Sequence, residues 1–304
     1  MPRQSIVVEN LSKSYDNVKA VHAINFNVDE GEIFGLIGPD GAGKTTIFRM
    51  LVTLMIPDEG TATVEGFDSV TDYKKIRKII GYMPGKFSLY HDLTVEENLK
   101  FYATIFGTTI QENYYLIKDI YSQIEPFRKR LAGKLSGGMK QKLALSCALI
   151  HKPSVLFLDE PTTGVDAVSR KEFWEMLKHL KEQGITILVS TPYMDEAVLC
   201  DRVALIMNGN ILSIDTPQNI IDNFHEDMIA IRTENIYRLL NDLREYNQTK
   251  TAFPFGRFVH YTDKSGNVNE KEILTYLQSK NYKHIEMNPV KANIEDCFIK
   301  LMKQ

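Results

Sequence analysis

Three short stretches of the chain are almost continuously apolar, which is the pattern of strands buried on both faces of a parallel sheet. They are Ile33–Ile37, Val155–Leu158 and Ile185–Ser190. Such strands recur here before stretches with helical periodicity, so we expect an α/β core. Ser5–Val8 and Ala23–Val28 are instead predicted to be strands of a smaller antiparallel sheet.

Helical periodicity replaces the strand pattern between about residues 94 and 150. The first helix is predicted to begin at Thr94, because Thr94 and Glu97 have the spacing of a capping box. A turn at Glu30-Gly31 separates the antiparallel strands from the core. The sequence therefore predicts an inserted helical subdomain of about residues 94–150 within an α/β domain.

The pattern changes again beyond about Asp222, where glycine-rich loops disappear and short strands alternate with helices. With 304 residues, a main domain and an appendage are expected. We predict a first domain of residues 1–222 and a small α+β extension of residues 223–304. The predicted strands of the extension are Met228–Arg232, Gly256–Tyr261 and His284–Met287, and its predicted helices are Ile236–Tyr246, Glu270–Asn281 and Asn293–Met302.

Composition and charge limit the partners and the cellular compartment that we expect for this chain. A net charge of -3 gives no excess of Lys and Arg for a phosphate backbone, so nucleic acid is not an expected partner. Cys147, Cys200 and Cys297 lack metal-ligand or redox spacing, which indicates a reducing, cytosolic compartment. Met1–Glu9 lacks the pattern of a signal peptide. The apolar runs are far shorter than the roughly 20 residues that span a bilayer, so any membrane role is expected to come through a partner.

A glycine-rich loop follows the first core strand and has the P-loop spacing. It consists of Gly38, Pro39, Asp40, Gly41, Ala42, Gly43, Lys44 and Thr45, and Thr46 continues into the helical stretch that ends near Leu54. Glycines let backbone N–H groups converge on phosphate oxygens at the start of a helix. Lys44 is expected to reach the outer phosphates and Thr45 to ligate Mg²⁺. The alternative interpretation is a flexible glycine turn. The position of the loop between a predicted strand and a predicted helix disfavours it.

Two carboxylates, Asp159 and Glu160, end the second core strand. Asp159 is suited to hold Mg²⁺ through water, and Glu160 is placed to orient or deprotonate an attacking water. A surface acidic turn is the alternative, and the upstream P-loop disfavours it.

A third motif, Leu135-Ser136-Gly137-Gly138-Met139-Lys140-Gln141, places a serine and two glycines at the start of a predicted helix. A helix cap with a spare glycine pair would explain it without function. Together with the P-loop, however, it resembles the LSGGQ-type signature of ABC ATPases. The resemblance implies that Ser136, Gly137 and Gly138 contact ATP bound by a second subunit, so a single chain would not complete a site.

Other motifs in residues 1 to about 220 extend the resemblance. Tyr15 lies where the family stacks an aromatic ring on adenine, although strand packing would also explain it. Pro161–Asp166 resembles the D-loop, through which subunits communicate, or else a simple turn. Leu93–Leu99 resembles the segment at the groove where family members receive a transmembrane partner.

Two positions depart from the family pattern. Gly85 stands where the family usually has the Q-loop glutamine, and Pro192 where it usually has the switch histidine. Neither residue has a side chain that donates a hydrogen bond or accepts a proton. Two interpretations remain open. Either the site tolerates the changes because Lys44 and Glu160 remain, or its own hydrolysis is weak and its signature serves a second, active ATPase.

Within the family the chain is similar to the drug and multidrug export branch. Thr162–Asp166 and Ser169–Trp174 are most similar to the first nucleotide domain of tandem ATPases of the YbhF type. Asn293–Ile299 resembles the closing helix of daunorubicin-resistance-type ATPases. The resemblance implies an ATP-hydrolysing subunit with ATP and Mg²⁺ as cofactors, bound through a transmembrane permease to the inner face of the cell membrane. Its second ATPase subunit would be identical or different.

Two other classes of function are alternatives to a transporter subunit. An ABC ATPase acting on ribosomes or chromosomes carries two nucleotide domains or long coiled coils, and this chain shows neither. A regulatory clamp that binds ATP without hydrolysing it is kept open by Gly85 and Pro192, although Glu160 argues against a fully inactive one.

Overall fold

The continuous apolar runs form the centre of a six-stranded sheet in the computed structural model, which describes residues 3–303. The sheet has the order β10-β9-β3-β8-β7-β6. Its neighbours from β9 to β6 are parallel, and only β10 pairs antiparallel, with β9. Every residue of β3, β7 and β8 is buried, as expected for the interior of a parallel sheet. The strands are β3 (Ile33–Ile37), β6 (Ile80–Met83), β7 (Val155–Asp159), β8 (Thr186–Thr191), β9 (Arg202–Met207) and β10 (Asn210–Asp215).

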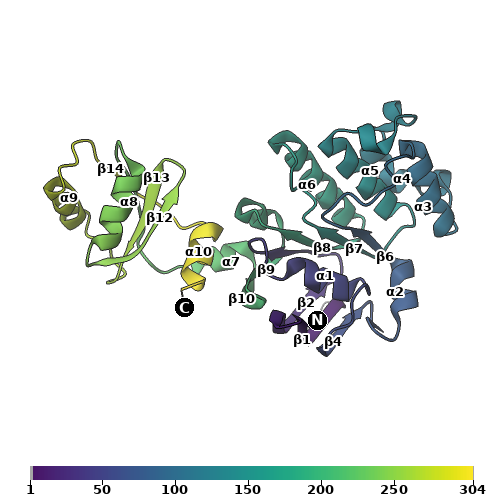
Figure 1. Cartoon of the computed structure of the whole chain (residues 1–304), viewed down its shortest axis with the longest axis horizontal. Coiled ribbons are helices and arrows are strands. Elements are labelled where there is room, and N and C mark those ends of the chain that lie inside the picture. The colour runs from purple at the N-terminus through teal and green to yellow at the C-terminus, as the bar shows by residue number, and fades with distance from the viewer. Residues whose placement is uncertain (1–2, 304) are drawn as a thin grey trace. The chain divides into compact units, whose positions relative to one another are not determined.

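Helices cover both faces of this sheet. Figure 1 shows α1 (Lys44–Leu51) on one side and α6 (Ala167–Glu182) on the other. The ring of Phe48 in α1 packs edge-on against that of Phe157 in β7, with centroids 6.0 Å apart. Because Ile47, Phe48 and Leu51 are fully buried, the helix after the phosphate loop is anchored on the sheet. α2 (Tyr73–Ile79) precedes the edge strand β6.

A second sheet, entirely antiparallel, has the order β2-β1-β4-β5. Its strands are β1 (Gln4–Tyr15), β2 (Val18–Asp29), β4 (Glu59–Val64) and β5 (Phe67–Asp68). The first two are longer than predicted. Asn10 and Ala23 have positive φ angles of 50° and 46°, and the register of β1 against β2 shifts between Val8 and Leu11. Such irregularities break the alternation by which a strand is recognised in sequence.

The predicted helical insertion consists of α3 (Val95–Ile105), α4 (Ile110–Tyr121) and α5 (Gly137–Leu149), with two short 3-10 turns, η1 (Glu125–Phe127) and η2 (Ala132–Lys134). The capping box predicted at the start of α3 is confirmed: the Thr94 hydroxyl accepts from the Glu97 N–H, and the Glu97 carboxylate accepts from the Thr94 N–H. Figure 1 shows the three helices beside one another. A further 3-10 helix, η3 (Met194–Leu199), follows β8.

The chain divides into two compact units between Pro217 and Gln218. The sequence places the domain boundary later, after Asp222. Most of α7 (Pro217–Asp222) therefore belongs to the second unit, and the Cys297 thiol of the last helix donates to its Ile220 carbonyl at 3.5 Å.

The second unit is an antiparallel sheet with the order β12-β13-β11-β14 and helices between its strands. The element order β11-α8-β12-β13-α9-β14 is the βαββαβ arrangement. Its core contains Ile231, Leu239, Leu243 and Tyr261. The elements are β11 (Ile229–Arg232), α8 (Ile236–Glu245), β12 (Thr249–Phe255), β13 (Phe258–Asp263), α9 (Glu270–Ser279), β14 (Glu286–Pro289) and α10 (Ile294–Leu301).

The structure confirms the predicted α/β core, the antiparallel subdomain and the helical insertion. Among residues 3–303, no helix is long and apolar enough to cross a membrane.

Candidate functional site

The phosphate loop joins the end of β3 to the start of α1, and two of its glycines, Gly38 and Gly43, occupy positions where a side chain would not fit. A Cβ on Gly38 would lie 2.2 Å from the Ile206 carbonyl oxygen, and one on Gly43 2.6 Å from that of Ala20. Gly43 is the N-cap of α1, with a φ of 103° and no side chain capping the helix. The first N–H groups of α1 therefore remain available for an anion at the helix N-terminus.

Lys44 lies inside this loop and is 3% exposed. Its ammonium donates to the carbonyls of Gly38 at 2.8 Å and Pro39 at 2.9 Å. It also lies 3.1 Å from the Glu160 carboxylate. The lysine at the start of α1 and the carboxylate that follows β7 therefore meet, although 116 positions separate them (160 − 44).

The two carboxylates at the end of β7 have different environments. Asp159 is 2% exposed and accepts a hydrogen bond from the Ser190 hydroxyl at 2.7 Å. The Glu160 side chain is 22% exposed. The Glu160 backbone has a φ of 49°, and its N–H donates to the carbonyl and hydroxyl oxygens of Ser190 at 3.1 and 3.0 Å. A left-handed non-glycine residue held in this way is a strained conformation of the kind found at functional sites.

The negative charge of Asp159 affects the pKa of Tyr82 in the neighbouring strand β6. Burial raises the pKa of Tyr82 to about 12, and the negative charge of Asp159 adds to the effect. Tyr82 therefore stays a neutral phenol beside the acidic strand end at physiological pH.

Tyr15 lies close to the start of α1. It is 40% exposed, and its hydroxyl is 3.3 Å from that of Thr46 and 3.2 Å from the Met55 sulfur. Thr45, the second residue of α1, is half-buried, and Asp40 is exposed at the tip of the loop. The structure thus gathers the P-loop, Tyr15 and the two carboxylates around the N-terminus of α1.

The serine and glycines of the signature lie at the start of α5, close to Gly164 and Ser169 and away from the P-loop residues described above. Ser136 is the N-cap and accepts from the Met139 N–H at 3.4 Å. A Cβ on Gly138 would lie 2.9 Å from the Ser169 hydroxyl, and one on Gly137 3.5 Å from the Gly164 carbonyl. These contacts place Ser136, Gly137 and Gly138 beside the turn that precedes α6.

The two positions that depart from the family pattern adjoin the carboxylates and the P-loop. A Cβ on Gly85 would lie 3.1 Å from the Asp159 carbonyl and 3.8 Å from the Glu160 Cβ. Pro192 follows Thr191, whose carbonyl accepts from the Gly38 N–H at 3.3 Å. Gly85 therefore lies next to the end of β7, and Pro192 directly follows a residue that contacts the P-loop.

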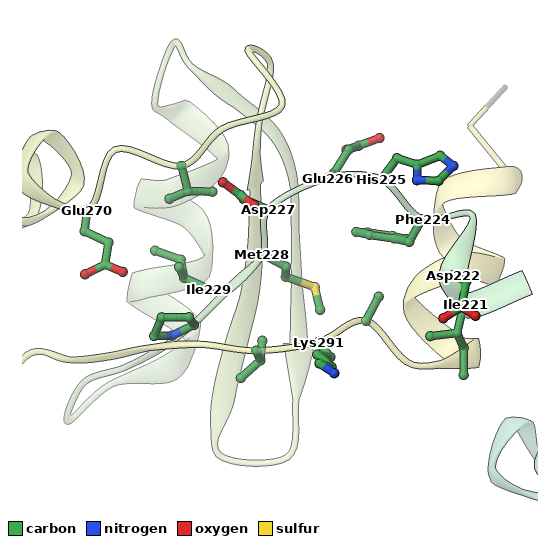
Figure 2. A pocket seen from close by; sticks show the side chains of 14 residues that line it. Ile221, Asp222, Phe224, His225, Glu226, Asp227, Met228, Ile229, Glu270 and Lys291 are labelled. Atoms are coloured by element: carbon green, nitrogen blue, oxygen red, sulfur yellow. The ribbon is translucent and has the colours of Figure 1, made fainter. Parts of the chain in front are cut away.

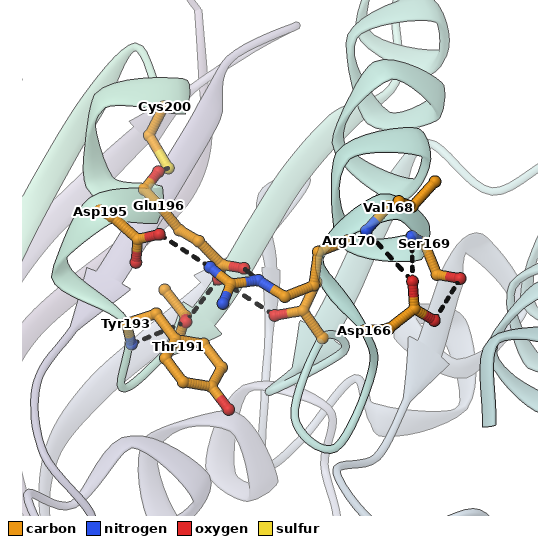
Figure 3. A network of polar contacts seen from close by, with 10 residues as sticks. Asp166, Val168, Ser169, Arg170, Thr191, Tyr193, Asp195, Glu196 and Cys200 are labelled. Carbon is orange, nitrogen blue, oxygen red and sulfur yellow. Dashed lines mark hydrogen bonds and ion pairs between the residues drawn. The ribbon is translucent and has the colours of Figure 1, made fainter.

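Sequence reasoning assigned no role to Glu196, which the structure shows at the centre of a polar network (Figure 3). Its carboxylate is buried and accepts from Thr191, Thr162 and Arg170. The only signal in the sequence is an acidic residue shortly after a buried strand. Nothing in the local pattern indicates that a residue from the turn after β7 and another from α6 would meet it.

A cavity of about 580 Å³ lies in the second unit (Figure 2). Its walls come from the segment from the end of α7 to the start of β11, the start of α9, and the segment between β14 and α10. The lining is mixed, with Asp227, Glu270 and Lys291 beside Met228 and Ile229. Glu226 also lines the cavity and is already paired with Lys250 and Lys300. This cavity is formed by the second unit alone and contains none of the predicted nucleotide-binding residues.

The donors around α1 fit magnesium held jointly with phosphate oxygens. Within the described part of the chain, no three His, Cys, Asp or Glu residues cluster in a way that would hold a metal on their own. Magnesium is usually bound by one or two protein oxygens together with water and substrate phosphates. The hydroxyl of Thr45 and the buried carboxylate of Asp159 are donors of that kind.

Comparison with known proteins gives consistent matches. The model of the family described as "ABC transporter" matches residues 21–163. The probable multidrug ABC transporter ATP-binding protein YbhF of Escherichia coli (strain K12) is 46% identical over 212 residues, which are 68% of this chain and 36% of that protein. The chain thus spans only about a third of the length of this relative.

Other relatives match over most of their length. A Nod factor export ATP-binding protein I of Burkholderia thailandensis is 35% identical over 297 residues, covering 96% of this chain and 95% of the relative. A solved ATP-binding subunit of an ABC transporter is 29% identical, with a TM-score of 0.66 over 72% of this chain and 92% of that one. The dimeric ABC transporter cassette MJ0796 is 26% identical, with a TM-score of 0.63 over 69% and 98% of the two chains.

Proposed function

This chain belongs to the ATP-binding subunits of ABC transporters, and we propose that it hydrolyses ATP to drive a transmembrane partner in an exporter. The observation that carries the proposal is the contact of Lys44, at the start of α1, with Glu160, which directly follows Asp159 at the end of β7. Export is supported by the relatives, whose names describe a multidrug transporter and Nod factor export.

Each group at the site has a distinct role in this proposal. The backbone N–H groups of the loop from Gly38 to Gly43, except that of Pro39, which has none, and those of Lys44, Thr45 and Thr46 bind phosphate oxygens. The Lys44 ammonium stabilises the charge of the outer phosphates. Glu160 orients or deprotonates the attacking water. Tyr15 contacts the adenine ring.

Thr45 and Asp159 would hold magnesium, which when bound neutralises charge on the phosphates. Asp159 is well placed for this role because the Ser190 hydroxyl donates to its carboxylate and helps to fix its orientation. Second-shell hydrogen bonds of this kind orient metal ligands.

The proposal includes a dimer and a membrane partner. Ser136, Gly137 and Gly138 would contact ATP bound to a second ATPase subunit, identical or different, as the resemblance of this segment to the ABC signature implies. The dimeric structure of MJ0796 gives a precedent in a related protein. A permease would then place this chain in the cytoplasm at the inner face of the membrane.

A second candidate function is an ATP-binding clamp with weak hydrolysis that pairs with an active ABC ATPase. Gly85 and Pro192 favour it, since both adjoin the site and neither side chain forms hydrogen bonds. Loss of groups that stabilise developing charge commonly costs about 10²–10³ in rate. Under this alternative, ATP binds tightly and turnover is slow.

Steady-state Mg-ATP hydrolysis by the purified chain, across a range of protein concentrations, separates the two functions. If the proposed function is correct, turnover rises with protein concentration, and Glu160→Gln lowers it by about 10²-fold or more, as expected for loss of a general base. Glu182→Gln is the control, because that side chain is 72% exposed on α6. Tight ATP binding without turnover would contradict hydrolysis at this site and support the clamp.

A further inference from the structure

Glu196 links three separate segments of the first unit. Its carboxylate accepts from the Thr191 hydroxyl at 2.6 Å, the Thr162 hydroxyl at 3.1 Å and the Arg170 Nε at 3.1 Å. Glu196 is 2% exposed, so these contacts are shielded from water. Figure 3 shows Thr191 and Arg170 reaching it from β8 and α6.

Two of these partners lie next to the groups that hold Glu160. Thr162 follows Glu160 by two positions, so its hydrogen bond restrains the backbone just after that carboxylate. Thr191 directly follows Ser190, which accepts from the Glu160 N–H. The Thr191 carbonyl also accepts from Gly38 at the start of the P-loop. Glu196 therefore links the backbone after Glu160 to the end of β8, which accepts hydrogen bonds from both Glu160 and the P-loop residue Gly38.

Pro192 increases the importance of this link. Proline has no N–H, and its side chain has no polar atom. The turn after β8 is instead held by Thr191, whose hydroxyl accepts from the Tyr193 N–H at 3.0 Å and donates to Glu196. Arg170 also contacts this turn, because its guanidinium lies over the Tyr193 ring, 4.4 Å from the ring centroid.

We propose that Glu196 is a positioning residue for hydrolysis, which holds Glu160 in line with the P-loop by way of Thr162 and Thr191. The inference rests on the proposed function. A displacement of about 1 Å in a reacting group can cost on the order of 10²-fold in rate. Because Glu196 contacts neither Lys44 nor the P-loop backbone directly, its loss should affect kcat and leave ATP binding intact.

The test is the kinetics of Glu196→Gln in the full chain, with kcat and KM for Mg-ATP measured beside the affinity for a fluorescent ATP analogue. We expect kcat to fall by about 10-fold or more per folded molecule, within the range for residues that act through others. KM and nucleotide affinity should stay within about twofold of the unchanged chain, since a purely positioning role leaves binding alone.

Thr162→Val provides a second variant in case Glu196→Gln folds poorly. It removes one hydroxyl at nearly constant volume and should lower kcat by a smaller factor. Because Glu196 acts partly through its hydrogen bond with Thr162, the two changes combined should lower kcat no more than Glu196→Gln alone.

Glu32→Gln is the matched control. Glu32 is also a buried carboxylate paired with an arginine, Arg202, at 3.3 Å. It precedes β3 and therefore lies at the opposite end of that strand from the P-loop. Its replacement should lower the melting temperature without changing kcat.

The outcomes distinguish the inference from the function on which it rests. A normal kcat in Glu196→Gln, or additive effects of the two variants, would overturn the positioning role and leave hydrolysis established. Equal losses of kcat in Glu196→Gln and Glu32→Gln would also overturn it. Absence of turnover in the unchanged chain would overturn hydrolysis at this site and the role of Glu196 together.

Discussion

Gly43 shows how one residue controls the geometry of the phosphate loop. Its φ of 103° and the Ala20 carbonyl, 2.6 Å from where a Cβ would lie, both exclude a side chain. Gly31 offers a comparison, since its φ of 72° is also positive but no atom lies within 4 Å of a Cβ there. The two glycines therefore separate the effect of backbone strain from that of a steric clash.

Gly43→Ala is expected to weaken ATP binding at least about tenfold, equivalent to about 1.4 kcal/mol, because the loop must move away from Ala20. Gly31→Ala should cost about 1–2 kcal/mol of stability through strain alone and leave ATP affinity unchanged. Titration with a fluorescent ATP analogue and urea unfolding measure the two effects. Normal ATP affinity in Gly43→Ala would contradict this account of the loop.

At the scale of elements, His151 connects the helical insertion to the parallel sheet. Its ring stacks on that of Phe106, which follows α3, with centroids 3.7 Å apart. Its Nε2 lies 2.9 Å from the Ile80 carbonyl of β6, and its buried Nδ1 has no hydrogen-bond partner among the described residues. Burial lowers the pKa of His151, although the hydrogen bond to Ile80 opposes the shift.

This lowered pKa predicts a pH dependence of stability. The unfolded chain binds the proton more readily than the folded protein, so the free energy of unfolding falls as pH drops from about 6.5 toward the lowered folded-state pKa. Outside that window His151 contributes no slope. His151→Gln should lose less stability between pH 7 and pH 5, as measured by urea unfolding. An unchanged pH slope in this variant would contradict the prediction.

Strand β12 illustrates why some elements escape sequence analysis. It was not predicted, and it contains Pro254, which cannot donate a hydrogen bond within a sheet. The structure accommodates it because β12 is an edge strand that pairs only with β13. Whether a strand lies at an edge depends on the whole sheet, so the local pattern of Thr249–Phe255 was not sufficient.

At the scale of the whole molecule, each unit has its own hydrophobic core. The core of the second unit is built from α8, α9 and its sheet, and Leu243 of α8 is fully buried within it. The predicted nucleotide-binding residues all belong to the first unit. A substitution in the core of the second unit is therefore expected to lower the stability of that unit without changing ATP binding.

Leu243→Ala is expected to destabilise the second unit by about 2–5 kcal/mol, the usual cost of a large-to-small change in a core. ATP affinity should not change, because the first unit keeps its own core. Tyr237→Ala, at an 80% exposed position on the same helix, is the control. Urea unfolding and nucleotide titration would report both effects, and a parallel loss of ATP affinity would show that the units depend on each other.

Local patterns were enough to predict the α/β core, the helical insertion, the capping box at Thr94 and the P-loop. Each of these depends on interactions between residues close in the chain, or on apolar periodicity that any buried element must show. The acidic end of β7 belongs to the same group, since Asp159 and Glu160 directly follow an apolar strand.

Only the tertiary structure decided which distant groups meet. The contact of Lys44 with Glu160, the cavity of the second unit and the network around Glu196 all join residues from separate elements. The positive φ of Glu160 likewise depends on Ser190, a residue of the neighbouring strand. Such contacts arise from the order of strands in a sheet and the packing of helices upon it, which no short stretch of sequence contains.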